Sequence, residues 1–327
     1  MGTSHSRGRC ERHAQTGRST VRDALLRPAW QLSVADAILI AMPLVPSSPL
    51  VSTQWLADHL GSDELVVIDA SVRTTGIGRA TAWAPAFDDY VEDGHVPGAV
   101  FADLVDTLSA SGSDLPFTRP DSARFERAIS ALGVSNDDTV VVYDRDLGQW
   151  SARLWWLFRS FGFDQVAVLD GGFTKWQHEG RPIRSGAMSG TARERRSATA
   201  FLATEERPVW ADRDRVLRAV DGSEPAALVC AAPSDAGGVG RSELIPGSTT
   251  IPVRTLVDAD TNALLRPKAL SAVLEPVLAS EEIVTYCGVG TAACVDALAL
   301  TVLGHERVRV YDGSLADWWR EPEPLAS

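Results

Sequence analysis

Thr139-Val-Val-Val-Tyr143 and, after one apolar segment, Val166-Ala-Val-Leu-Asp170-Gly171 form a pattern that this chain uses twice. The second copy reads Ile283-Val-Thr-Tyr286 and then Val308-Arg-Val-Tyr-Asp312-Gly313, and in both copies a tryptophan follows five residues after the Asp-Gly glycine. The copies are 143 residues apart at their tyrosines, far longer than the roughly 20–50 residues of a solenoid unit. The repeat therefore indicates a duplicated domain.

Each copy alternates short β-branched runs with helical patterns. In the first copy, the apolar spacing of residues 122–132 and 151–161 predicts helices between the strands. This alternation is typical of βαβ units, in which helices cover both faces of a mainly parallel sheet. We therefore predict an α/β protein with two such domains, in agreement with 327 residues at about 100–200 per domain.

The predicted boundaries follow from composition. We expect an N-terminal extension over 1–48, a first domain over 49–183, a Ser-, Gly-, Ala- and Arg-rich linker over 184–206, and a second domain over 207–327. Residues 1–41 hold six arginines against three acids, which fits a disordered stretch, a start of translation at Met42, or a transit peptide. Of these, we expect a stretch that is disordered or not translated.

The overall composition excludes several classes of protein. Hydrophobic residues make up 45% and charged residues 23%, as in ordinary globular domains. The net charge of -12 argues against partners such as nucleic acid or an anionic membrane. Four cysteines are too few for a disulfide framework, and no apolar run is long enough to span a bilayer, so we expect a cytoplasmic protein.

The two copies differ most in the loop after the first repeated strand, where open α/β sheets bind their ligands. The second copy has Cys287-Gly288-Val289-Gly290-Thr291-Ala292 at this point, and the first copy has Asp144 in the position of the cysteine. A cysteine between a strand and a helix N-terminus meets converging backbone N–H groups, which favour thiolate over thiol. Cys287 is thus a candidate nucleophile. A buried, inert cysteine is the alternative.

Two other functions fit this loop less well. Gly288-x-Gly290-x-x-Ala293 after a strand matches a dinucleotide fingerprint, but that unit normally opens its domain, and here only residues 313–327 follow the next Asp-Gly. A cysteine phosphatase needs an arginine at the end of the loop to bind the phosphate dianion. Residues 287–293 contain no basic residue, which argues against that chemistry.

From residue 50 to 319 the sequence resembles the tandem rhodanese family of sulfurtransferases. The resemblance rests on the following motifs: His95-Val-Pro-Gly-Ala99, Tyr143-Asp144, Ser151-Ala-Arg153, Trp155-Trp156, Asp170-Gly-Gly-Phe-x-x-Trp176 and Tyr286-Cys287-Gly-x-Gly290. It implies two rhodanese-like domains, the first non-catalytic with Asp144 and the second catalytic. It also implies that Cys287 takes a sulfane sulfur, becomes a persulfide and passes the sulfur on, without metal or organic cofactor, and that residues 288–292 cradle the sulfur.

The resemblance favours 3-mercaptopyruvate over thiosulfate as the sulfur donor. Family members that use thiosulfate usually have a basic residue directly after the cysteine, whereas Gly288 stands there. The sequence departs from the family at two positions. Val289 replaces a serine of the 3-mercaptopyruvate group, and Ala232 replaces an arginine that, in the family, binds the anion of either donor. Arg241 is our candidate for that cation, with an exposed loop charge as the alternative.

Some other motif residues allow two interpretations. His95 either contributes to the site between the domains, as the resemblance implies, or is a structural histidine that bonds its own turn. For Asp69 and Arg73 we expect an internal ion pair. Cys230 could be a resolving thiol, but it and Cys294 are better interpreted as small buried hydrophobes.

Other expectations concern packing and partners. The tryptophans at 150, 155 and 156 have helical spacing and predict core and domain-interface packing rather than a ligand platform. The expected partners are a small-molecule sulfur donor and a thiol or cyanide acceptor, with a thioredoxin-like protein among the candidates. A non-catalytic persulfide carrier that serves a protein partner is the alternative function.

Overall fold

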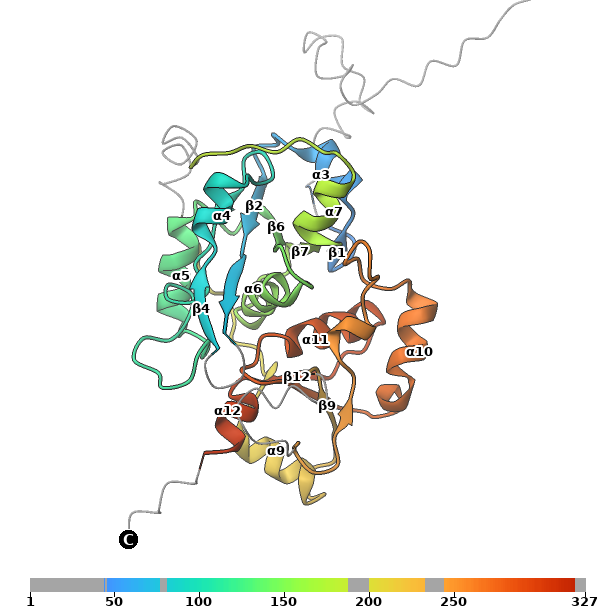
Figure 1. Ribbon diagram of the computed structural model, residues 1–327. Helices are drawn as coiled ribbons and strands as arrows, with labels where there is room; N and C mark the ends of the chain where they lie inside the picture. The colour runs from blue at the N-terminus through green and yellow to red at the C-terminus, as the bar shows by residue number, and fades with distance from the viewer. Residues whose placement is uncertain (1–43, 45, 77–80, 188–199, 233–243, 321–327) are drawn as a thin grey trace, which may run out of the picture. The chain divides into compact units, whose positions relative to one another are not determined.

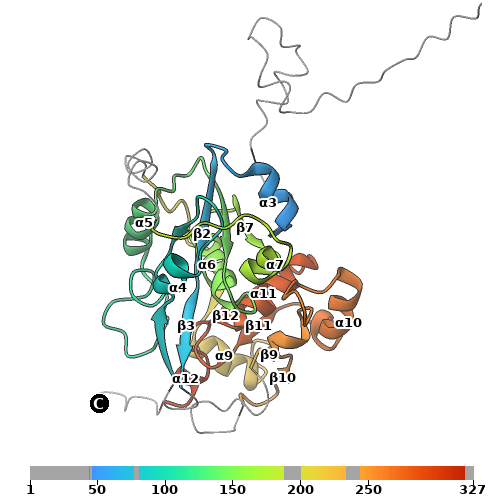
Figure 2. The same ribbon diagram turned by 45° about the horizontal axis from the view of Figure 1, so that its top comes forward.

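The computed structural model describes residues 44, 46–76, 81–187, 200–232 and 244–320, and all elements below belong to one compact unit, Val45–Ser327 (Figures 1 and 2). The expected N-terminal extension falls almost wholly outside the described residues. The unit contains two five-stranded sheets, one in each half of the chain, and a separate two-stranded sheet. We call the halves the first and second domains.

The first domain contains the sheet β1-β7-β6-β2-β5, in which all strands run parallel. Its strands are β1 (Leu50–Val51), β2 (Leu65–Asp69), β5 (Val100–Phe101), β6 (Thr139–Tyr143) and β7 (Val166–Leu169). Its helices are α3 (Thr53–His59), α4 (Phe87–Glu92), α5 (Ser122–Ala131), α6 (Gln149–Ser160) and α7 (Gly172–His178). β3 (Val72–Thr75) and β4 (Ala82–Pro85) form an antiparallel hairpin beside this sheet.

The second domain repeats this arrangement in the parallel sheet β10-β9-β11-β12-β8. Its strands are β8 (Trp210–Ala211), β9 (Ala227–Cys230), β10 (Thr249–Thr250), β11 (Ile283–Tyr286) and β12 (Val308–Tyr311). Its helices are α9 (Arg213–Val220), the 3-10 turn η3 (Val253–Thr255), α10 (Pro267–Leu278), α11 (Ala293–Val302) and α12 (Ser314–Trp318). The predicted fold class, two α/β domains with parallel sheets and flanking helices, is confirmed.

Local sequence explains where the helices begin. Ser52, Asp121 and Asp212 cap α3, α5 and α9, because each side chain accepts a hydrogen bond from the backbone N–H three residues later. The central strands β6 and β11 are buried throughout, in agreement with their continuous apolar sequence. These two strands end at the loops that differ between the copies.

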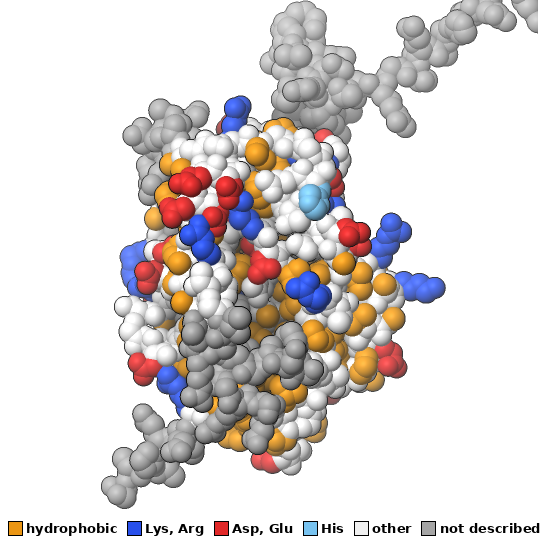
Figure 3. All heavy atoms as spheres, in the orientation of Figure 1, with side chains coloured by type: hydrophobic (Ala, Val, Ile, Leu, Met, Phe, Trp, Pro, Cys, Tyr) orange, Lys and Arg blue, Asp and Glu red, His pale blue; other side chains and the backbone are white. Residues whose placement is uncertain are grey.

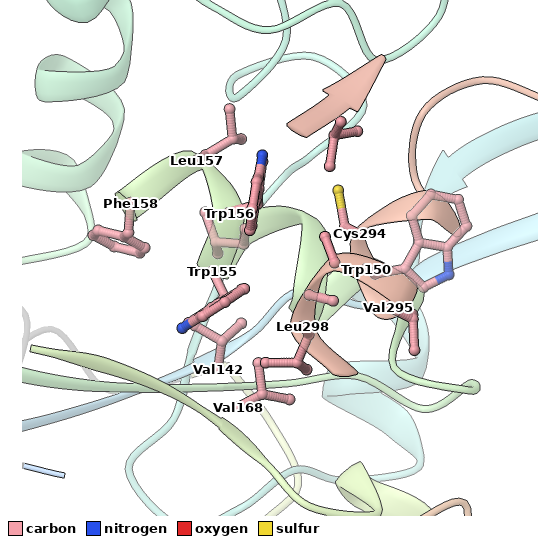
Figure 4. Packing of buried hydrophobic residues seen from close by; sticks show 14 of the residues in the cluster. Val142, Trp150, Trp155, Trp156, Leu157, Phe158, Val168, Cys294, Val295 and Leu298 are labelled. Atoms are coloured by element: carbon pink, nitrogen blue, oxygen red, sulfur yellow. The ribbon is translucent and has the colours of Figure 1, made fainter. Parts of the chain in front are cut away.

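The helices that follow those two loops, α6 and α11, pack against each other and join the domains (Figure 1). Figure 4 shows Cys294, Val295 and Leu298 of α11 close to the tryptophan-rich side of α6. Trp150, Trp155 and Trp156 are at most 2% exposed and belong to the main hydrophobic core. The expected packing role of the three tryptophans is confirmed.

The segment between the domains is attached to the first domain at both ends. Arg184 exchanges backbone hydrogen bonds with His95, and Phe201 is buried against Phe125 and Phe158 of that domain. From its sequence we interpret this segment as a linker, and the packing of Phe201 into the first domain was not predicted. Residues 188–199 lie outside the described part, and the expected boundaries stay predictions.

The surface carries charges of both signs. On the face drawn in Figure 3, lysine and arginine side chains stand among acidic ones and among hydrophobic side chains. Within the described residues, none of the helices is both long and apolar enough to cross a membrane.

Candidate active site

Cys287 directly follows β11 at the carboxyl edge of the second sheet. Its side chain is 3% exposed, and its Sγ accepts a hydrogen bond of 3.1 Å from the Gly290 backbone N–H. The backbone of Cys287 is held from the other side, because its N–H donates to Ser314 Oγ at 3.1 Å and its carbonyl accepts from the Leu315 N–H at 3.0 Å. The strand end and α12 thus fix the cysteine while the loop folds over its sulfur.

Gly290 is the residue that lets the loop close. Its φ is +82°, and a Cβ there would lie 2.4 Å from the carbonyl oxygen of Asp312, so only glycine fits. Gly288, by contrast, has no atom within 4 Å of a Cβ position and accepts a hydrogen bond from the Ala316 N–H. Of the five amides expected to cradle the sulfur, that of Gly290 makes a hydrogen bond to Sγ.

The matching loop of the first domain is filled by its own carboxylate. Asp144 is fully buried and accepts hydrogen bonds from the backbone N–H groups of Asp146, Gly148, Trp150 and Ser151 at 2.8–3.2 Å. The Ser151 hydroxyl donates to the same carboxylate at 2.9 Å. Burial raises the pKa of Asp144 to about 6, although the donors act in the opposite direction. The Asp144 carboxyl therefore uses the loop amides of the first domain as its own hydrogen-bond donors.

Arg153 of α6 reaches from the first domain to the Cys287 loop of the second. It is 1% exposed and donates from Nη2 to Asp312 Oδ1 at 2.6 Å and to the Phe117 carbonyl at 2.5 Å. Its Nη1 lies 3.4 Å from the Gly290 carbonyl, and its guanidinium lies over the Trp210 ring, 4.6 Å from the centroid. Burial by itself would lower the pKa of Arg153, but Asp312 raises it overall. From the sequence, Arg153 is recognised only as part of a family motif and has no assigned role. Its contacts could not be predicted, because they depend on how the two domains pack.

The two other described cysteines are buried. Cys230 ends β9 beside Tyr286, and burial raises its pKa to about 11. Cys294 begins α11, and its thiol donates to the Gly290 carbonyl at 3.3 Å, with a pKa that burial raises to about 12. Both fit the expectation of small buried side chains, and Cys294 also helps to hold Gly290.

The comparisons with known proteins agree with this geometry. The model of the Rhodanese-like domain matches residues 52–179 and 220–321. This chain belongs to the rhodanese family. The mitochondrial thiosulfate/3-mercaptopyruvate sulfurtransferase 1 of Arabidopsis thaliana is 33% identical over 308 residues, covering 86% of this chain and 79% of the relative.

Two further relatives carry different substrate names. The thiosulfate sulfurtransferase of Rattus norvegicus is 34% identical over 292 residues, covering 84% of this chain and 93% of the relative. The crystal structure of SseA from Escherichia coli, described with the rhodanese fold and mechanism of 3-mercaptopyruvate sulfotransferases, matches with a TM-score of 0.69. It is 29% identical and covers 84% of this chain and 100% of SseA.

Of the two residues outside the loop that the rhodanese resemblance offered for the site, only one is described. His95 is 3% exposed, stacks on Tyr90 with ring centroids 3.9 Å apart, and bonds the Tyr90 carbonyl through Nδ1 at 2.9 Å. This geometry is that of the structural alternative, and its role in the site stays a prediction. Arg241 lies outside the described residues. Ala232, where the usual arginine is missing, is half-buried two residues after β9 ends.

The expected ion pair of Asp69 with Arg73 is wrong. Arg73 lies on the β3–β4 hairpin and pairs with Asp89, its Nη2 2.5 Å from Oδ1. Asp69 is fully buried, and its nearest cation is Arg145, whose Nε lies 4.0 Å from Oδ2. β2 ends at Asp69 and β3 begins at Val72 in a separate two-stranded sheet, so Arg73 and Asp69 belong to different sheets.

Two cavities near the domain contact present arginines. One of about 300 Å³ is lined by Arg119, Arg213, Trp210 and Asp312, and one of about 220 Å³ by Arg145, Trp150 and residues of β3. Acidic side chains also line both cavities, Asp212, Asp312 and Asp317 in the first and Asp89 and Asp146 in the second. Among the described residues, histidine, cysteine and acidic side chains form no group of three that could hold a metal ion.

Proposed function

We propose that this chain is a sulfurtransferase that carries a sulfane sulfur on Cys287 as a persulfide. The observation that carries the proposal is the contrast between the two loops. In the first domain the loop amides hold the Asp144 carboxylate, and in the second the loop at the corresponding strand end holds a cysteine with the Gly290 N–H aimed at its sulfur. An amide N–H aimed at the sulfur stabilises a thiolate or the outer sulfur of a persulfide.

The loading step transfers one sulfur atom. The Cys287 thiolate attacks the sulfur of 3-mercaptopyruvate, a new S–S bond forms, and the C–S bond breaks. Its electron pair leaves with the carbon, which takes a proton and becomes pyruvate. With thiosulfate the bond that breaks is S–S, and sulfite leaves. The Gly290 N–H would stabilise the sulfur during both reactions.

The discharge step restores the enzyme. A thiolate or cyanide attacks the outer sulfur, the persulfide S–S bond breaks, and its electron pair returns to Cys287 as thiolate. Cyanide becomes thiocyanate, and a thiol becomes a persulfide. We propose a thiol or cyanide as acceptor, with a thioredoxin-like protein among the candidates.

We propose 3-mercaptopyruvate as the preferred donor and thiosulfate as the second. The loop 287–292 has no cation to match a sulfonate, and its Cys-Gly-x-Gly pattern resembles that of the 3-mercaptopyruvate group. Relatives with both substrate names match this chain about equally well, so the proposal rests on the loop. Cytoplasmic location also stays a proposal, since one relative is mitochondrial.

Thiocyanate release from cyanide tests the function, with each donor run on wild type, Cys287→Ser and Cys294→Ser. Serine at 294 can still donate to the Gly290 carbonyl, so this matched variant should keep most of the activity, whereas Cys287→Ser should lose it. No turnover with either donor, but a persulfide of about 32 Da on Cys287 by intact mass, would favour the carrier alternative. Absence of both would refute sulfur transfer.

A further inference from the structure

The Cys287 loop of the second domain is contacted by Arg153, a residue of the first domain. Gly290 presents its N–H to the sulfur of Cys287, and its carbonyl receives Nη1 of Arg153 from the first domain. The same guanidinium is anchored by Asp312, whose carbonyl oxygen lies against Gly290. Three groups from two domains thus meet at the residue that contacts the sulfur.

The contacts restrain Gly290 from every direction that would turn its N–H away. Its positive φ and the close Asp312 carbonyl prevent movement toward β12. Its carbonyl is bound by Arg153 at 3.4 Å and by the Cys294 thiol at 3.3 Å. The Gly290 N–H and carbonyl lie in neighbouring peptide planes that φ and ψ of Gly290 join. Holding the carbonyl from two sides, with φ fixed at +82° by the close Asp312 carbonyl, therefore limits how far the N–H can turn from the sulfur.

We propose that Arg153 is a positioning residue for sulfur transfer, which keeps the Gly290 N–H aimed at the sulfur of Cys287. The inference rests on the function proposed above. It gives the first domain, whose own loop is filled by Asp144, a direct part in the active site of the second. Arg153 does not touch the sulfur and acts through Gly290.

The buried surroundings make this arrangement specific for arginine. The guanidinium is planar and donates in three directions at once, to Asp312, Phe117 and Gly290. A lysine keeps the charge beside Asp312, but its single ammonium on a flexible stem cannot reproduce the set of contacts. If Arg153 had only a structural role, the replacement would lower stability and leave the loading rate and the loop unchanged, whereas a positioning role predicts that both the rate and the loop change.

Arg153→Lys therefore separates the two roles. We expect the rate of persulfide formation in a single turnover with 3-mercaptopyruvate to fall by roughly 10- to 100-fold, at the lower end of what loss of an aimed donor costs. KM should change by less than about twofold, because Arg153 does not contact the donor. Hydrogen–deuterium exchange of the peptide that spans 287–292 should become faster, since the Gly290 N–H is less well held.

Arg215→Lys is the matched control. Arg215 is 7% exposed and pairs with Glu282 at 2.7 Å within the second domain, so it is an equally buried ion pair. Within the described chain, Arg215 forms hydrogen bonds or ion pairs with Asp212, Glu224 and Glu282, and none of these partners lies in residues 287–292. We expect Arg215→Lys to lower the melting temperature without changing the loading rate or the exchange of the loop.

Two results would overturn the inference. The first is that Arg153→Lys keeps the wild-type loading rate and the wild-type exchange of the loop. The second is that Arg215→Lys slows loading and speeds loop exchange as much as Arg153→Lys does. Failure of the proposed function is distinguishable, because wild type would then form no persulfide. Loop exchange would still report whether Arg153 holds Gly290, since this measurement needs no donor.

Discussion

Replacement of Gly290 by alanine should affect stability and activity together. The new Cβ would lie 2.4 Å from the Asp312 carbonyl oxygen, in a backbone conformation with φ +82°. Left-handed backbone costs an L-residue about 1–2 kcal/mol, and relief of such a clash in a packed region costs about 1–3 kcal/mol more. We expect the free energy of unfolding to fall by roughly 3 kcal/mol. Loss of the aimed N–H should lower kcat/KM by about 10²- to 10³-fold.

Two glycines serve as matched controls. Gly172 meets the Asp144 carbonyl at the same 2.4 Å in the first domain, with φ +54°, so Gly172→Ala should destabilise without touching the cysteine loop. Gly288 has open space around it, so Gly288→Ala should change the free energy of unfolding by less than about 0.5 kcal/mol. Stability is measured by urea unfolding and activity by thiocyanate release.

The reasoning fails if Gly290→Ala unfolds at the same urea concentration as wild type. It fails equally if Gly288→Ala loses as much activity as Gly290→Ala, because the open loop would then contribute as much as the clamped residue. A Gly172→Ala variant that is destabilised but keeps wild-type kcat/KM would show that the activity loss at Gly290 does not come from destabilisation alone.

Three further predictions concern the two loops and the missing cation. Because burial raises the pKa of Asp144 to about 6, the folded chain binds this proton more tightly than the unfolded chain, so the contribution of Asp144 favours folding below about pH 4 and is lost as the pH rises through 6. The unfolding free energy of wild type minus that of Asp144→Asn should therefore fall by up to roughly 3 kcal/mol between pH 4 and pH 7 in urea titrations, and a rise would contradict the assignment. At pH 8, iodoacetamide should modify Cys287 well before Cys230 or Cys294, because burial raises the pKa values of these two thiols to about 11 and about 12. Peptide mapping measures the order of modification, and the opposite order would contradict the prediction. Ala232→Arg should lower the KM for 3-mercaptopyruvate by roughly tenfold if the absent cation limits donor binding, and an unchanged KM would remove that explanation.

Much of the fold was predictable because it rests on local patterns that occur twice. The continuous apolar runs of β6 and β11 and the helical spacing after them are present in the sequence. Because the same pattern occurs in both copies, each copy strengthened the fold prediction for the other. The helices expected over 122–132 and 151–161 are α5 and α6, with ends that differ by one or two residues. The anchoring of the interdomain segment by Phe201 was not predictable, since one phenylalanine in a polar stretch gives no periodic signal.

The features of the candidate site also fall into those that the sequence predicts and those that only the structure shows. The position of Cys287 at a strand end could be inferred from the chain alone, because it depends on neighbours within a few residues. The requirement for glycine at 290 comes from Asp312, which only the fold brings close. The pairing of Arg73 with Asp89 was missed, since it depends on a hairpin that turns the side chain outward. The sequence by itself thus determined the duplicated α/β fold and the place of Cys287 directly after a buried strand. Only the tertiary structure decided which residues hold the loop, because Arg153 and Gly290 are 137 residues apart and meet through the packing of α6 on α11.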